Sequence, residues 1–165
     1  MNRNWNKDWR KSVIVLSGGF DPVHKGHLRM FREASWLGHQ VVVGLNSDEW
    51  LKRKKGKPFM EFEERKEILE GFKYINTVLP FDDSDDTACD LIKKVRTMYN
   101  SETFNYDYRD IGHAGFEDYH QIYFANGGDR GKDNVPEVDV CKQLDVVMLW
   151  GIGGGKIQSS SWLIN

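Results

Sequence analysis

Short apolar runs alternate along this chain with amphipathic segments. The apolar runs, rich in β-branched residues, predict five strands at residues 13–16, 40–45, 77–80, 122–125 and 146–150. Apolar residues at helical spacing predict four helices at residues 25–37, 61–72, 87–98 and 136–144. Gly38 suits the end of the first helix. A further helix with a serine cap is expected at residues 159–164.

Alternation of strands and helices is typical of an α/β fold. We predict a Rossmann-like, doubly wound parallel sheet of about five strands with helices on both faces. Ligands of such sheets bind beyond the carboxyl ends of the strands, near the point where the strand order reverses. We therefore expect the functional site in the loops that follow the strands. No repeat or linker is found, so residues 1–165 are expected to form a single domain with a polar tail at residues 1–11.

Residues 100–121 interrupt the alternation, because they are polar, rich in aromatic side chains and without a clear period. A loop of this length in a compact domain is usually functional or mobile. Two interpretations stay open: a surface excursion packed by its own aromatic residues, or a lid or acceptor-binding element. The acidic run at residues 82–86 is expected to be a solvated loop and helix cap.

Composition excludes several classes of protein. The 165 residues carry a formal charge of −2, which argues against a dedicated nucleic-acid binder. Cys89 and Cys141 lie far apart and form no CxxC pair, so a disulfide framework or cysteine-rich zinc site is not expected. No apolar stretch is long enough for membrane insertion, and the first residues lack a secretory signal. We expect a cytoplasmic protein.

A glycine-rich loop with two histidines follows the first predicted strand; residues 18–27 are GGFDPVHKGH. Backbone amides at a helix start, together with the positive end of the helix dipole, favour phosphate oxygens. Gly26 removes a side chain where a nucleotide could approach the backbone. His24 and His27 are three residues apart and can therefore face one ligand. We predict that both imidazoles donate hydrogen bonds to charge that develops in a transition state, with helix capping as the alternative.

This loop resembles the HxGH signature of the cytidylyltransferase-like nucleotidyltransferases. The resemblance continues through NSDE at residues 46–49, the lysine run at residues 52–57 and EERK at residues 63–66. From residue 20 to residue 66 the chain is similar to glycerol-3-phosphate cytidylyltransferase without a gap. GGD at residues 127–129 resembles the step after the family's fourth strand, and the serines at residues 159–161 resemble its closing serine/threonine motif. The heptose-phosphate adenylyltransferases are the other group that it resembles closely.

The resemblance implies a set of site residues. His24, His27 and Lys54 take the catalytic positions, and Arg65 matches a family arginine that is assigned to the acceptor. The nucleotide-binding positions are Gly19, Phe20, Asp21, Gly26, Lys57, Gly128, Asp129, Lys156, Ser159, Ser160 and Ser161. No residue is assigned as a direct metal ligand, because Mg²⁺ is expected to arrive on the nucleotide phosphates.

Each of these assignments has a structural alternative. The lysine run taken alone is typical of a solvated loop, and Arg65 suits a salt bridge on a helix surface equally well. Asp129 could stabilise a turn, and one of the three serines could be a plain helix cap. Asp21 could orient a histidine, hold Mg²⁺ through water, or make buried hydrogen bonds within the loop.

The chain departs from the family pattern near its end. Family members commonly carry an arginine shortly before the closing motif, where this chain has GGGKIQ at residues 153–158. Lys156 could supply the charge there without the bidentate geometry of arginine. Hydrophobic residues follow the last serine, in place of the basic residue found in many members. The heptose-type enzymes tolerate an apolar residue at that point.

The function implied is nucleotidyl transfer from a nucleoside triphosphate to a phosphorylated small molecule, with release of pyrophosphate. CTP with glycerol 3-phosphate, or a related polyol or sugar phosphate, is favoured by the ungapped stretch. The alternatives are an adenylyltransferase that uses ATP and a sugar phosphate, and a nucleotide-binding module that has lost catalysis. The partners expected are small molecules rather than nucleic acid. Family members are often dimers, so the resemblance also leaves a homodimer open.

Overall fold

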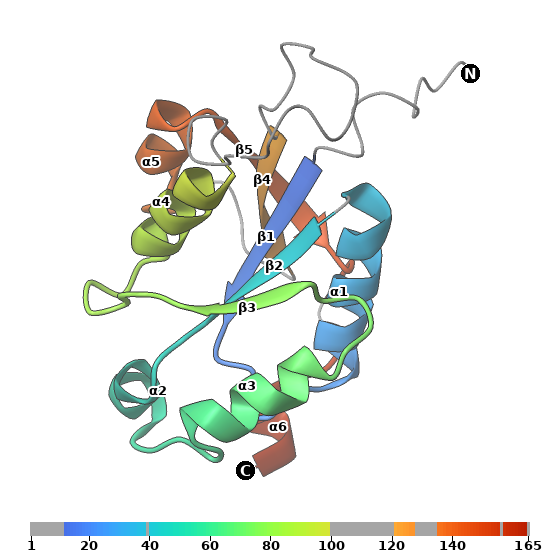
Figure 1. Cartoon of the computed structure of the whole chain (residues 1–165). Helices are drawn as coiled ribbons and strands as arrows, with labels where there is room; N and C mark the ends of the chain where they lie inside the picture. Colours follow the sequence, from blue (N-terminus) through green and yellow to red (C-terminus); the bar gives the residue numbers. More distant parts are fainter. Residues whose placement is uncertain (1–11, 39, 100–120, 128–134, 156, 165) are drawn as a thin grey trace, which may run out of the picture.

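The computed structural model describes residues 12–38, 40–99, 121–127, 135–155 and 157–164, and the statements below concern these residues. Five strands form one parallel sheet in the order β3-β2-β1-β4-β5 (Figure 1). The strands are β1 (Ser12–Gly18), β2 (Gln40–Leu45), β3 (Thr77–Pro80), β4 (Gln121–Gly127) and β5 (Val146–Ile152). The chain moves outward from β1 to β3 and then returns to the other side of β1, so the strand order reverses between β1 and β4. The predicted α/β class and all five predicted strands are confirmed.

Helices cover both faces of the sheet. They are α1 (Lys25–Leu37), α2 (Asp48–Lys55), α3 (Phe62–Glu70), α4 (Cys89–Met98), α5 (Val138–Gln143) and α6 (Ser160–Ile164). Helices α1 and α3 pack on one face, and α4 and α5 pack on the other. Figure 1 shows α2, α3 and α6 toward the end of the sheet where β1 and β2 finish.

Strand β1 is buried on both of its faces, as its continuous apolar run predicts. Val13 and Val15 belong to the apolar cluster under α4 and α5. Ile14 and Leu16 belong to the cluster under α1 and α3. All four side chains have no exposed surface. The two clusters therefore share one central strand, which extends from the core to the loop with the two histidines.

Helix α2 was not predicted, because the lysine run was expected to be a solvated loop. The run instead begins inside α2, which is lysine-rich and buries only Leu51. Ser47 accepts a hydrogen bond from the Trp50 amide and caps the helix, and Gly56 ends it with a φ of +92°. A pattern with one buried apolar residue is too sparse to indicate a helix. The available signal was the serine cap followed by two acidic residues.

The acidic run after β3 is only partly solvated, which corrects the expectation of a solvated loop and helix cap. Asp83 is 4% exposed and accepts hydrogen bonds from the Asn46 side chain, the Ser47 amide and the Ser47 hydroxyl. Ala88, not an aspartate, occupies the N-cap position of α4, and no side chain caps this helix. Asp83 therefore ties the loop after β3 to the start of α2.

One further prediction is not tested by the described residues, and another is tested only in part. Of the predicted loop at residues 100–121, residues 100–120 lie outside the described part of the chain. Among the helices that are described, none combines the length and the apolar character that a membrane span requires.

Candidate active site

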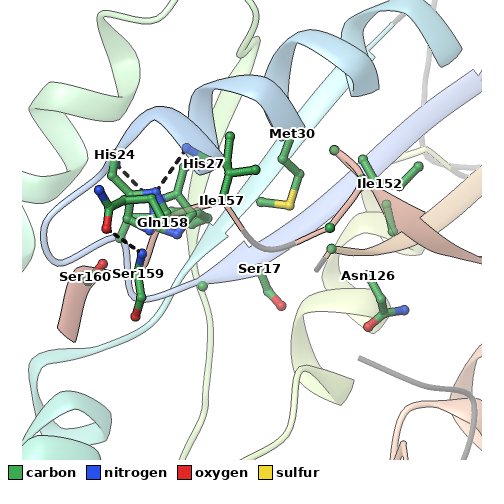
Figure 2. A pocket seen from close by; sticks show the side chains of 18 residues that line it. Ser17, His24, His27, Met30, Asn126, Ile152, Ile157, Gln158, Ser159 and Ser160 are labelled. Carbon is green, nitrogen blue, oxygen red and sulfur yellow. Dashed lines mark hydrogen bonds between the residues drawn. The ribbon is translucent and has the colours of Figure 1, made fainter. Parts of the chain in front are cut away.

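A cavity of about 480 Å³ opens at the carboxyl ends of β1 and β4, where the strand order reverses. Its walls come from the ends of these strands, the first turns of α1, and the segment from β5 to α6. Figure 2 shows the imidazoles of His24 and His27 gathered with Gln158, Ser159 and Ser160 in one part of this cavity. The described lining residues are Ser17, Gly18, Phe20, His24, Gly26, His27, Met30, Ala125, Asn126, Gly127, Ile152, Gly153, Gly154, Gly155, Ile157, Gln158, Ser159 and Ser160.

The two histidines form a reciprocal cap at the start of α1. The Gly26 amide donates to Nδ1 of His24 over 3.1 Å, and the His24 amide donates to Nδ1 of His27 over 3.2 Å. The two rings stack with their centroids 3.7 Å apart. The helix-capping alternative is therefore present, and the bonds that close the helix also bring both imidazoles to one cavity. That both rings face one ligand stays a prediction.

The capping bonds decide which nitrogen of each imidazole carries the proton. A neutral imidazole has one donor and one acceptor nitrogen, and here both Nδ1 atoms accept. The protons therefore lie on the two Nε2 atoms. Burial, reinforced by the nearby His24, lowers the pKa of His27 from 6.5 to about 3. His27 is thus a neutral Nε2–H donor at neutral pH.

The ring of Phe20 packs against the imidazole of His27 and positions it. The Phe20 backbone has a φ of +48°, a left-handed conformation that is uncommon for an aromatic residue. This conformation places the ring, 3% exposed, edge-on to His27 at a centroid distance of 4.8 Å and against Phe31 at 5.3 Å. The strained backbone is held by this packing, and the packing in turn positions the imidazole.

Glycines bring the opposite wall of the cavity close to α1. Gly153 and Gly154 have φ values of +80° and +74°, and a Cβ on Gly153 would meet the backbone of Met30 at 3.2 Å. The Gly153 amide donates to the Glu33 carboxylate over 2.7 Å. Sequence reasoning singled out Lys156 in this segment and missed these contacts, although the run of three glycines was a visible signal. Gly128, Asp129 and Lys156 lie outside the described residues.

Two of the three closing serines line the cavity. Ser159 and Ser160 line it, whereas Ser161 is exposed and does not. The Ser160 hydroxyl donates to the Pro22 carbonyl over 2.7 Å, and the hydroxyl oxygens of Ser159 and Ser161 lie 2.8 Å apart. The segment after β5 is thereby attached to the loop with the histidines.

Asp21 lies outside the cavity and stabilises the loop. Its carboxylate, 2% exposed, accepts hydrogen bonds from the amides of Phe59 and Met60 and pairs with Lys55 at 2.6 Å. Burial alone would raise the pKa of Asp21, but the bonds from Lys55, Phe59 and Met60 outweigh it and hold this pKa below 3.8. Of the interpretations left open for Asp21, buried hydrogen bonding is the one that the structure displays.

Arg65 is buried, so the alternative of a surface salt bridge is wrong. Its guanidinium, with a side chain 0% exposed, pairs with Asp48 at 2.7 Å. It also donates to the carbonyls of Gly19, Asn46 and Met60 over 2.8 to 2.9 Å. These bonds join the loops after β1 and β2 to α3. Arg65 does not line the cavity, and its assignment to the acceptor has no support from this placement.

Lys54, Lys57 and Gly19 lie outside the cavity wall. Lys54 is exposed, with its Nζ 5.4 Å from the centre of the Trp50 ring, and Lys57 is exposed just beyond the end of α2. Gly19 faces α2, because a Cβ there would meet Leu51 at 2.9 Å. Contact of these residues with a nucleotide therefore stays a prediction.

The described residues do not form a protein cage for a metal ion. They contain no group of three or more histidine, cysteine, aspartate or glutamate side chains that could hold one. Within the described cavity wall there is also no carboxylate. Arrival of a divalent cation on the phosphate oxygens of a nucleotide stays a prediction.

Fold and site together define a class of protein. A doubly wound parallel sheet with a helix start and two imidazoles at its switch point is a nucleotide-binding architecture. The family model described as cytidylyltransferase-like matches residues 15–138, and the chain belongs to this family of nucleotidyltransferases.

Curated relatives resemble part of the chain. A protein named Bifunctional protein HldE from Campylobacter curvus is 32% identical over 120 residues, which are 71% of this chain and 25% of that protein. Its namesake from Campylobacter concisus is 38% identical over 89 residues, 53% of this chain and 18% of that protein. The chain thus spans a quarter or less of the length of these relatives.

Solved structures share the fold. A lipopolysaccharide core biosynthesis protein from Thermoplasma volcanium superposes with a TM-score of 0.59 at 15% identity, over 88% of this chain and 98% of that one. A bifunctional NMN adenylyltransferase/ADP ribose pyrophosphatase from Francisella tularensis gives a TM-score of 0.59 at 15% identity, over 92% of this chain and 40% of that one. A further structure of that Francisella protein, complexed with AMP and a manganese ion, gives a TM-score of 0.51 at 18% identity, over 84% and 37%.

Proposed function

We propose that this protein transfers a nucleoside monophosphate from a nucleoside triphosphate to a phosphorylated small molecule. One observation carries the proposal: two stacked imidazoles, each with Nδ1 held by a backbone amide, line the cavity at the start of α1. Donors fixed before the reaction stabilise developing negative charge without reorganisation. Family membership supports the same reaction class.

The reaction needs no covalent intermediate on the protein. An oxygen of the acceptor phosphate attacks the α-phosphorus and forms a new P–O bond, while the bond from that phosphorus to the bridging oxygen breaks. Pyrophosphate leaves with the electron pair. The acceptor phosphate is already anionic, so no base is required to activate it. The protein's task is to align two anions that repel each other and to stabilise the charge between them.

In the described part of the cavity wall, positive potential comes from the backbone rather than from charged side chains. No lysine, arginine, aspartate or glutamate belongs to the described part of its wall. The positive end of the α1 dipole and the two imidazole donors favour the reacting phosphate. Lys54 and Lys57 would meet the β- and γ-phosphates from outside the wall, with Ser159 and Ser160 on the opposite side.

CTP with glycerol 3-phosphate or a related polyol phosphate is the substrate pair that the ungapped stretch from residue 20 to residue 66 supports. ATP with a sugar phosphate is the second candidate. Two observations favour it: structures with the same fold are named adenylyltransferases, one of them with bound AMP, and another is named for lipopolysaccharide core biosynthesis. Both candidates use the same transfer step.

The test is a thermal-shift screen of CTP, ATP, GTP and UTP with Mg²⁺, followed by pyrophosphate release. A ligand at 100 times its Kd stabilises the folded state by about 2.7 kcal/mol, a shift of several degrees in Tm. We expect one nucleotide to stand out and to release pyrophosphate with a polyol or sugar phosphate. Stabilisation without release, across the whole acceptor panel, would instead show a nucleotide-binding module that has lost catalysis.

A further inference from the structure

Two polar side chains at the strand ends have no role in the contacts described so far. Ser17 is the last residue but one of β1, and Asn126 is the last residue but one of β4. Both line the cavity. Because β1 pairs with β4 in the register Val15 to Phe124, Ser17 and Asn126 follow two positions later on neighbouring strands.

These two side chains point to the sheet face opposite the histidines. Successive residues of a strand alternate between the faces. Val15 and Phe124, two positions earlier, belong to the apolar cluster under α4 and α5. Ser17 and Asn126 therefore continue that face beyond its apolar part, whereas His27 packs on the α1 face through Phe20 and Phe31. In Figure 2 their labelled side chains lie apart from the group formed by the histidines and Gln158.

Asn126 is 3% exposed, and its side chain makes one long hydrogen bond to the described residues. Its Nδ2 donates to the Leu149 carbonyl over a long 3.4 Å, and its Oδ1 has no partner among the described residues. No fully buried side-chain oxygen or nitrogen in the described residues lacks a partner, so Oδ1 is not fully buried, and Asn126 lines the cavity. The Ser17 hydroxyl likewise has no partner in the described part of the chain. Polar groups left in this state are paired by a ligand or by water.

We propose that Ser17 and Asn126 determine the acceptor by hydrogen-bonding uncharged hydroxyl groups of a polyol or sugar phosphate. A hydroxyl both donates and accepts, so it can satisfy the Asn126 oxygen and the Ser17 hydroxyl. The described wall holds no charged side chain that would recognise an ammonium or a carboxylate there. This assignment rests on the proposed transfer reaction, and it specifies that the protein recognises the hydroxyl groups of the acceptor.

The two-sided geometry also separates the acceptor from the leaving pyrophosphate. In-line displacement requires the attacking oxygen and the leaving oxygen on opposite sides of the α-phosphorus. Ser159 and Ser160 occupy the histidine side of the cavity, where pyrophosphate is expected to leave (Figure 2). An acceptor whose hydroxyls lie against Ser17 and Asn126 approaches from the remaining side.

The test compares phosphates with and without hydroxyl groups. Binding of glycerol 3-phosphate, glucose 1-phosphate and n-propyl phosphate is measured by calorimetry, with the preferred Mg–nucleotide titrated separately. The variants are Ser17→Ala and Asn126→Leu, and Ser35→Ala on the outer side of α1 is the matched control. We expect at least one hydroxyl-bearing probe to bind the wild-type protein about tenfold more tightly than n-propyl phosphate, which corresponds to roughly two hydrogen bonds.

In the variants, we expect the preferred probe to weaken about three- to tenfold, while n-propyl phosphate and nucleotide stay within about twofold. Ser17→Ala removes one oxygen only and keeps the test open if Asn126→Leu fails to fold. Equal binding of all three phosphates by the wild-type protein, or a loss confined to the nucleotide, overturns the assignment. Pyrophosphate release is scored independently: selective binding without release contradicts the transfer reaction, whereas release without hydroxyl preference contradicts the role of Ser17 and Asn126.

Discussion

Each imidazole of the histidine pair has its Nδ1 held by a backbone amide, and both rings line the cavity. We expect His27→Ala to lower kcat about 10²- to 10³-fold, the usual cost of one fixed donor to a developing oxyanion. Pyrophosphate release gives the rate, and circular dichroism checks that the fold persists. Lys25→Ala, in the same turn but exposed, is the control. A rate for His27→Ala close to that of the control would remove His27 from the chemistry.

The lowered pKa of His27 also predicts how stability depends on pH. The unfolded chain takes up a proton near pH 6.5, whereas the folded chain resists it until about pH 3. Stability from this residue is therefore complete above pH 6.5 and is lost as the pH falls toward 3. Between pH 7 and pH 5 the free energy of unfolding should drop by roughly 1 to 2 kcal/mol.

Urea unfolding at pH 7 and pH 5 measures this drop, and His27→Ala should show a smaller one. Parallel pH profiles for the two proteins would contradict the neutral, buried state of His27.

At the scale of elements, Arg65 holds α3 to the loops that follow β1 and β2. Its guanidinium meets three carbonyls and the Asp48 carboxylate without exposure to solvent. Arg65→Met leaves these partners unpaired, so we expect a loss of about 3 to 5 kcal/mol in the free energy of unfolding. Lys66→Gln changes an exposed pair on the same helix and should cost less than about 0.5 kcal/mol. Similar urea midpoints for the two variants would be incompatible with this role.

At the scale of the whole molecule, both faces of the sheet depend on β1. Phe31 fills the cluster under α1, and Phe124 fills the one under α4 and α5. We expect Phe31→Ala and Phe124→Ala each to cost about 3 to 5 kcal/mol, while Phe59→Ala, at a side chain 62% exposed, should stay within about 0.5 kcal/mol. Urea unfolding followed by circular dichroism and by tryptophan fluorescence should give coincident curves. Separate transitions in either variant would show that the faces fold independently.

Predictability from sequence varied with the kind of contact involved. Residues 25–37 and 40–45 were predicted with the bounds that α1 and β2 have, because their periodicity is strong and local. Helix α2 was missed, since a helix that buries one residue has almost no hydrophobic pattern. Arg65 was assigned a surface position because the carbonyls that bury it come from segments distant in the chain.

The same distinction between local and long-range contacts applies to the site. The strand, the glycine turn and the two histidines lie within one stretch of sequence, so their order and spacing predicted the place of the site and began the family resemblance. The alternation of strands and helices along the whole chain predicted the class of fold. Which side chains share the cavity depended on packing between segments far apart in the chain. That packing turned Asp21 toward Lys55, left Lys54 on the surface, and brought Ser17 and Asn126 together on a face that no motif marks. Helices and strands depend mainly on interactions between residues that are near in sequence. The partners of a buried polar group depend on tertiary packing, because they come from segments that only the folded sheet and helices bring together.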